Sequence, residues 1–478
     1  MKMPARILII SFIFFLFPVQ PAKAFQWFDR EDWAGIYFQG KKLGFSHSKL
    51  EVTENELIVS SRIFFRLQVG GVNQVTSFSQ ESILNKELHL KSFSLLQEIM
   101  GHRQKVEGYV EKGKLFYEVT TLGYSKNYSK PFLPGYSLSS TSFMIILQKG
   151  LEVGKRGKFN LFVEPFQITK PLEYNILRTE KMKVNGKTET VYIINQKYVG
   201  TQSNLWVTRD GTIMRELAQN GMETLRESAE EAQKLGGASV SVSSFITLSL
   251  VKTRRPIDNP ENKRVLKIKM SNLVYEDMVP EDHRQTALET KKVGKGFSTI
   301  LKIESEPRKP SSRMQFPVTA KVDKAYLEET AEIQIGHPMI KALSRDLVDG
   351  QKYAWKAAKI INQWVFDNME KVLVDSFTAL HALHERRGEC QSHTNLFTAL
   401  ARAAGIPTKV VNGLVYSSEF KGFVYHAWAE VFVGEWRALD PTFGQNLVDA
   451  THIKLSEGGY EGTVKLMNFI GKVRIDIL

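Results

Sequence analysis

The chain has a single cysteine, Cys390, among its 478 residues. One thiol excludes an intramolecular disulfide, so the fold must be stabilised without a covalent cross-link. A lone cysteine is either a small buried hydrophobic residue or a reactive thiol, and its surroundings decide between the two. No cysteine lies near the N-terminus to accept a lipid, which excludes a lipoprotein anchor.

Long apolar runs are also scarce, and the composition, 42% hydrophobic and 24% charged, is typical of a soluble globular protein. The exception is Ile7 to Val19, which is too short to span a bilayer comfortably. Lys2 and Arg6 precede it, and the small residues of Ala22-Lys23-Ala24 follow it. This order is typical of an export signal over residues 1–24, so we expect a periplasmic or extracellular protein. The alternative is an uncleaved anchor, which two prolines near the cleavage site disfavour.

Acidic residues are outnumbered, and the formal net charge is +13. Removing the predicted signal takes away three basic residues and leaves about +10. Basic charge of this size favours anionic surroundings such as cell-wall polymer, lipid headgroups or acidic protein surfaces. Nucleic acid fits poorly because the basic residues are dispersed and the chain is predicted to be exported.

Residues 25–252 are predicted to form a β-rich domain. Val106 to Val119 has the alternation and central turn of a hairpin, and Asp210-Gly211 marks another. Strands at this spacing predict a meandering antiparallel sheet or an open barrel. Short helices are expected over residues 140–150 and 223–235.

A polar, proline-containing linker over residues 253–264 precedes a predicted smaller β unit or connector, residues 265–335. Residues 336–478 are predicted to form an α+β domain, because helices come first and antiparallel strands follow. Ser376 is the expected N-cap of its second helix and Gly405 the expected end of its third. The expected helices are 353–372, 377–386 and 390–404, and the expected strands are 409–416, 423–433 and 435–439.

Cys390 is predicted to start the third of these helices. Free backbone N–H groups and the helix dipole favour a thiolate there, and the pKa of such cysteines can fall from roughly 8.5 towards 3.5–7.5. The same N–H groups can donate to a developing oxyanion. A thiol enzyme that transfers acyl groups then needs only a base, for which histidine is the usual choice.

His426 lies in an alternating strand, and Asp440 closes the next one. A three-residue loop over 432–434, with Gly434 in the left-handed conformation, would place the two residues directly opposite each other, about 5 Å apart at Cβ. The carboxylate could then hold one imidazole nitrogen and fix its tautomer. The competing two-residue turn, Gly434-Glu435, would put the acid on the other face of the sheet.

Three segments resemble motifs of the transglutaminase-like superfamily. They are Gly388 to Phe397 followed by Ala403 to Val411, then His426 to Val431, and then Trp436 to Thr442. This resemblance covers about residues 376–452 and implies a papain-like fold for the C-terminal domain. It also implies a catalytic triad without a cofactor, in which Cys390 is the nucleophile, His426 the general base and acid, and Asp440 the orienting group.

Several further histidines are assigned no catalytic role, although His393 could line the cleft. His381 and His384 stand three residues apart, but no cysteine or carboxylate partner accompanies them, so no metal is assigned. His393, one helical turn after Cys390, is expected to pack in the interior. The remaining histidines with an ordinary surface or sheet role include His47, His89 and His102.

Two functions follow from these expectations. The first is an exported cysteine enzyme that attacks peptide or glutamine-type amides of the cell envelope through a thioester acyl-enzyme. Resolution by water makes it a peptidase or amidase, and resolution by an amine makes it a cross-linking acyltransferase. The alternative is a non-catalytic binding or assembly module of the envelope, in which the β-rich region binds a partner and the C-terminal domain is an idle scaffold.

Overall fold

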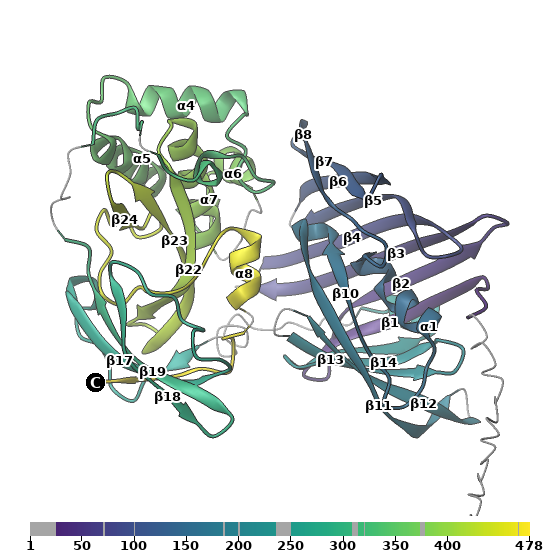
Figure 1. The fold of residues 1–478 in the computed structure, drawn as a ribbon. Coiled ribbons are helices and arrows are strands. Elements are labelled where there is room, and N and C mark those ends of the chain that lie inside the picture. The colour runs from purple at the N-terminus through teal and green to yellow at the C-terminus, as the bar shows by residue number, and fades with distance from the viewer. Residues whose placement is uncertain are drawn as a thin grey trace, which may run out of the picture.

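The computed structural model describes residues 25–69, 72–99, 101–184, 187–198, 201–235, 250–307, 314–319, 321–372, 378–466 and 468–478. The predicted export signal, residues 1–24, lies outside the described residues. A large β-sheet forms the N-terminal part, and helices and smaller sheets form the C-terminal part (Figure 1). Among the described helices, none combines the length and the apolar character needed to cross a membrane.

The N-terminal part is one sheet of 15 strands, in which strands adjacent in sequence pair almost throughout. Its first half is β1 Arg30–Phe38, β2 Lys41–Val52, β3 Glu56–Val69, β4 Val72–Asn85, β5 Leu90–Ile99, β6 His102–Glu111, β7 Lys114–Thr121 and β8 Tyr124–Pro131. Its second half is β9 Ser137–Leu138, β10 Arg156–Val163, β11 Ile168–Val184, β12 Lys187–Tyr198, β13 Thr201–Thr208, β14 Ile213–Ala218 and β15 Met222–Glu227. The two halves join where β1 pairs with β15. The predicted meandering antiparallel sheet is therefore confirmed.

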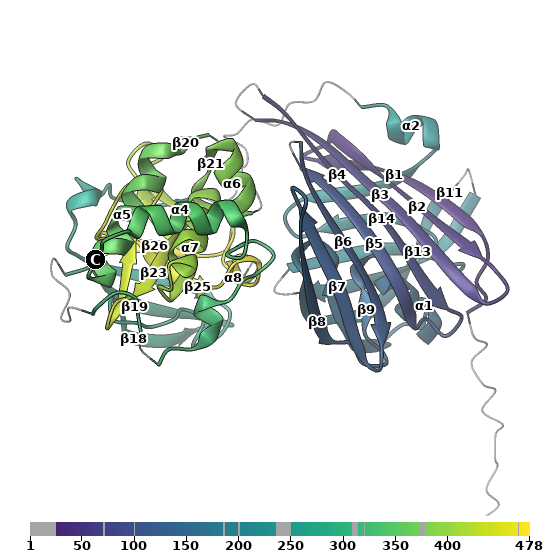
Figure 2. The same cartoon turned by 90° about the horizontal axis from the view of Figure 1, so that it is seen from above.

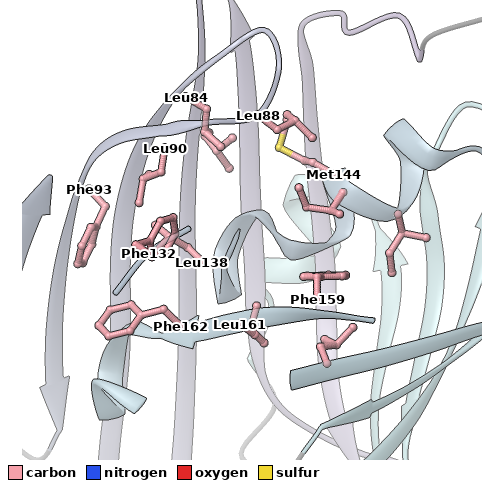
Figure 3. Close-up of a cluster of buried hydrophobic side chains, with 14 of the residues drawn as sticks. Leu84, Leu88, Leu90, Phe93, Phe132, Leu138, Met144, Phe159, Leu161 and Phe162 are labelled. Atoms are coloured by element: carbon pink, nitrogen blue, oxygen red, sulfur yellow. The ribbon is translucent and has the colours of Figure 1, made fainter. Parts of the chain in front are cut away.

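This sheet curves over on itself, and its core lies between the two halves (Figure 2). Phe93 of β5 meets Phe162 of β10 with ring centroids 6.2 Å apart. Helix α1, Ser142–Lys149, adds Met144 to the same cluster, as Figure 3 shows. Inward residues of both halves thus share one apolar core, which needs no disulfide.

One predicted helix of this domain is wrong. Residues 223–227 belong to β15, and only Ala229–Gln233 is helical, as α2. Ser228 separates the two elements, because its side chain accepts from the N–H of Glu231 as an N-cap. Pairing of β15 with β1, about 190 residues earlier in the chain, overrides the local helical pattern.

The C-terminal part combines helices with antiparallel sheets (Figure 1). Its helices are α4 Pro338–Val348, α5 Ala354–Asn368, α6 Ala379–Glu385, α7 Cys390–Ala403 and α8 Tyr460–Leu466. Its main sheet has the order β16-β23-β22-β25 with β24 on β23, where β16 is Val251–Lys252, β22 Thr408–Ser417, β23 Gly422–Phe432, β24 Trp436–Leu439 and β25 Ile453–Glu457. Helices α4 to α7 form one group, and α8 lies apart from this group, next to β22 (Figure 1). The α+β prediction is confirmed. Thr378, not Ser376, caps α6; Ser376 lies outside the described residues.

A smaller sheet packs beside this one, in the order β18-β19-β17-β26. Its strands are β17 Val265–Leu273, β18 Gln285–Val293, β19 Gly296–Glu304 and β26 Arg474–Ile477. The last strand comes from the end of the chain and pairs with β17. Ile268 and Leu301 of the small sheet share an apolar cluster with Phe423 and Ile453 of the main sheet. The segment after the linker is therefore packed into the C-terminal body.

A buried ion pair also joins the two sheets. Arg437 of β24 and Glu306, just after β19, approach to 3.2 Å, with both side chains at most 1% exposed. Glu306 in addition accepts from the backbone N–H of Ala438 at 2.8 Å and from His283 at 2.6 Å. This cluster fixes β24, at whose end Asp440 lies.

The N-terminal sheet contacts the C-terminal part through polar and aromatic side chains. His102 at the start of β6 packs against His381 of α6 with ring centroids 4.3 Å apart. Phe166 packs against Tyr460 at the start of α8, with ring centroids 5.3 Å apart. Burial lowers the pKa of His102 and lowers that of His381 to about 3, and the neighbouring histidines add to the effect on His381.

The His381 contact predicts a loss of stability in acid. Unfolded His381 binds a proton below its ordinary pKa of 6.5, whereas folded His381 does so only near pH 3. Its stabilising contribution is therefore complete above pH 6.5 and is lost as the pH falls, by about 1.4 kcal/mol per pH unit at most. In His381→Asn, urea unfolding measured between pH 7.5 and 4.5 should depend less steeply on pH. This prediction would be contradicted if the stability of His381→Asn depended on pH as steeply as that of the parent protein and of a His89→Asn control.

Candidate active site

Cys390 is the first residue of α7, as predicted. The preceding residue, Glu389, is extended and forms the N-cap position, so the first N–H groups of the helix are close to the thiol. Gly405 follows the helix at φ +81°, a conformation that favours glycine. Helix α7 packs against β22 and β23, and the charge of His426 on β23 acts on Glu389, directly before Cys390.

His426 and Asp440 form a direct hydrogen bond, with Nε2 and Oδ2 2.7 Å apart. Both residues are buried, at 6% and 0% exposure. Burial alone would raise the pKa of Asp440, but His426 and a second histidine, His452, hold it well below its ordinary range. An ionised Asp440 accepts the Nε2 proton of His426, which leaves Nδ1 as the basic nitrogen of the ring.

The hairpin that sets this geometry differs from the predicted one. Its loop is 433–435, with Gly434 in the middle at φ +99°, and Phe432 pairs with Trp436. Continuing this register places Asp440 beside Trp428, so it is a diagonal and not a direct neighbour of His426. Relative to the predicted register, the residue opposite Asp440 changes from His426 to Trp428. Because this shift is two residues, the side chains of His426 and Asp440 stay on the same face of the sheet. The predicted loop was wrong, while the predicted His426–Asp440 contact is present.

Both carboxylate oxygens of Asp440 accept hydrogen bonds. Oδ1 accepts from the backbone N–H groups of Thr442 at 2.7 Å and Phe443 at 3.2 Å. Oδ2 accepts from His426 and also from Nε2 of His452 at 3.1 Å. The carboxylate is therefore fixed in position and in ionisation before any substrate arrives.

His452 is a site residue that the sequence did not reveal. Burial alone would lower its pKa, but the hydrogen bond to Asp440 and the nearby charge of Asp449 raise it. Its Nδ1 lies 3.4 Å from Oδ1 of Asp449, so the ring lies between two carboxylates. His452 directly precedes β25, and only the pairing of β25 with β22 brings it to Asp440. No local spacing signals such a contact.

The start of α7 and the His426–Asp440 pair border the same part of the site. Burial raises the pKa of Glu389, and the charge of His426 opposes this shift across the site. Phe443 stacks flat on His426, with centroids 4.8 Å apart and ring planes 9° from parallel. Phe443 is 41% exposed, so it forms a solvent-facing wall next to the imidazole.

The other histidines named above take different places. His393 is fully buried in α7, and its Nδ1 lies 2.9 Å from the carbonyl oxygen of Glu389. His381 lies at the contact with the N-terminal sheet and His384 is exposed. Within the described residues, ligand atoms of His426, Asp440 and His452 lie within 4.8 Å of one another. A metal ion at this point would have to displace the N–H hydrogen bonds that Asp440 accepts from His426 and His452, and we assign no metal.

Residues 341–441 match the family model described as the Transglutaminase-like superfamily. Over these residues the C-terminal part of the chain is similar to the transglutaminase-like superfamily, and its fold, in which helices precede antiparallel strands, is of the α+β class. The matched segment includes all three residues predicted as the triad.

Solved structures give weaker likenesses. A "Putative Cysteine Protease" from Cytophaga hutchinsonii is 16% identical, covers 45% of this chain and 81% of its own, and has a TM-score of 0.31. A "Putative Protease" from Parabacteroides distasonis is 10% identical, covers 56% and 64%, and has a TM-score of 0.20. These scores are too low to carry an argument about activity. No curated protein matches the chain.

Proposed function

We propose that the C-terminal domain is a cysteine acyl-transfer enzyme acting on peptide or glutamine-type amides. The observation that carries the proposal is the buried 2.7 Å bond between Nε2 of His426 and Oδ2 of Asp440, beside the start of the helix that bears Cys390. The predicted export signal supports a location in the periplasm or outside the cell, where amides of wall peptide or protein are the available substrates.

The reaction follows from the roles of these groups. Nδ1 of His426 accepts the thiol proton of Cys390, and the thiolate attacks the amide carbonyl carbon. N–H groups at the start of α7 donate to the resulting oxyanion. As the C–N bond breaks, protonated His426 gives its proton to the leaving amine, and a thioester remains. Water or a second amine, deprotonated by His426, then attacks the thioester and releases the thiol.

Product analysis tests this proposal. The full chain is incubated with a glutamine-containing peptide and a fluorescent primary amine, with Cys390→Ser as the control. Release of an amine that depends on Cys390 is expected, either ammonia from the glutamine side chain or a peptide amine from the backbone, together with the free acid or the fluorescent amide. The ratio of the two products distinguishes a hydrolase from a transferase. Equal product in the parent and in Cys390→Ser would reject the enzyme and favour the binding module.

His452 provides a second prediction for the same site. His452→Leu removes one donor to Asp440 and should lower kcat about tenfold, with a cost of about 1–3 kcal/mol in stability for the buried acceptor. Because His452 helps to keep Asp440 ionised, the acidic limb of the pH–rate profile should also move to higher pH. His452→Gln retains an N–H donor and should lie between the leucine variant and the parent. An unchanged pH profile in His452→Leu would show that His452 only fills space.

A further inference from the structure

Lys371 is attached to the nucleophile side of the site through its backbone. It lies in β20, Glu370–Lys371, which pairs in parallel with β21, Arg387–Gly388. The register places Lys371 opposite Gly388, two residues before Cys390. The N–H of Val372 donates to the carbonyl of Gly388 at 3.4 Å. The position of Lys371 is therefore fixed relative to the start of α7.

The side chain of Lys371 extends to the histidine side of the site. Its Nζ lies 5.1 Å from the ring centroid of Phe443 and 5.2 Å from that of Phe366. Phe443 is the ring that stacks flat on His426. Phe366 packs under the turn at Gly444, where an added Cβ would lie only 2.8 Å from the Phe366 ring. A positive charge is thus seated on the aromatic wall that borders the imidazole.

The charge of Lys371 is available to a ligand. The residue is exposed. Its charge acts on Glu389, directly before Cys390, and on His393, one helical turn after it. Glu389 is partly buried, and burial raises its pKa, while the charge of Lys371 opposes this shift. The two rings shield part of the ammonium from water, which strengthens its attraction for an anion.

We propose that Lys371, seated on Phe443, binds a carboxylate of the substrate, so that the enzyme prefers acidic peptides. The inference rests on the proposed function, because it assigns a substrate class to the same site. A carboxylate is the group that fits, since the exposed cation lies over Phe443, the ring that stacks on His426, and this ring offers an apolar wall for the adjoining methylene groups. The substrate amide would lie between Cys390 and His426, with the acidic group towards Lys371.

Two alkylating reagents test the charge without requiring a known substrate. Iodoacetate and iodoacetamide both form an S–C bond with the Cys390 thiolate and release iodide, but only iodoacetate carries a carboxylate. In the full chain, Lys371→Gln should lower the ratio of the iodoacetate rate to the iodoacetamide rate about five- to tenfold at low salt. Lys371→Arg should retain the ratio. The matched control is Lys359→Gln, because Lys359 also lies over a ring, 6.0 Å from the centroid of Trp355.

The outcomes separate this inference from the proposed function. An unchanged ratio in Lys371→Gln, or an equal drop in Lys359→Gln, overturns the role of Lys371 while the enzyme proposal stands. Failure of Cys390 to react faster than an ordinary thiol with either reagent overturns the enzyme proposal itself. In the second arm, paired glutamine peptides with flanking glutamate or flanking glutamine are compared. A preference of about tenfold in kcat/KM for the acidic peptide, abolished in Lys371→Gln, supports the proposal, and equal kcat/KM values for the two peptides overturn it.

Discussion

Replacing Asp440 with asparagine is expected to lower kcat by about 10⁴-fold while leaving the fold intact. The carboxylate accepts hydrogen bonds from Nε2 of both His426 and His452. An asparagine can present its NH2 group to His426, which would place the ring proton on Nδ1. That nitrogen could then no longer accept the thiol proton, so the thiolate would not form.

Asp449→Asn is the matched control for this variant. Asp449 is also buried and also lies near His452, at 3.4 Å, but it accepts its hydrogen bonds from Gln445 and Thr451. We expect less than about a tenfold fall in kcat for Asp449→Asn. Single-turnover acylation by a peptide ester, with circular dichroism to verify folding, distinguishes the two variants. A folded Asp440→Asn protein that acylates at nearly the parent rate would contradict the assigned role of Asp440.

Replacing Arg437 with methionine is expected to have the largest effect on stability. Arg437 and Glu306 are paired at 3.2 Å, with side chains 1% and 0% exposed. Removal of Arg437 takes the guanidinium from a buried carboxylate that keeps the hydrogen bonds from Ala438 and His283, at a cost of about 3–5 kcal/mol. The effect should appear as a lower urea midpoint for the C-terminal domain, followed by tryptophan fluorescence.

The control for this prediction is an exposed pair on α4. Arg345 and Asp346 are 3.7 Å apart and 80% and 71% exposed, so Arg345→Met should change stability by less than about 1 kcal/mol. Because β24 leads into Asp440, Arg437→Met should also slow acylation under conditions in which the domain is still folded. Equal urea midpoints for Arg437→Met and Arg345→Met would show that the buried pair does not stabilise the domain.

Local sequence signals predicted the parts of the site that depend on neighbouring residues. The apolar spacing and Gly405 placed α7 with Cys390 at its start, and alternation placed His426 on a strand. The hairpin register was harder to predict, because a glycine with positive φ fits several positions of a short loop. The contact with Asp440 is nevertheless present because the register differs by two residues, which conserves the face of the sheet.

Contacts made by distant pairing were not predictable in this way. His452 reaches Asp440 only through the pairing of β25 with β22. Strand β15 replaced a predicted helix because it pairs with β1 at the opposite end of the domain sequence. Lys371 joins the site through a two-residue strand whose partner, Gly388, lies 17 residues later. In each case the chain between the partners carries no periodic signal for the contact.

The most direct test of the central claim is the rate of Cys390 alkylation by iodoacetamide as a function of pH. If His426 activates the thiol, Cys390 should react well below pH 8, where an ordinary thiol with a pKa of about 8.5 is mostly protonated. The His426→Ala variant should lose this reactivity at low pH. A single titration near pH 8.5 in the parent, unchanged in His426→Ala, would contradict the catalytic pairing of Cys390 with His426.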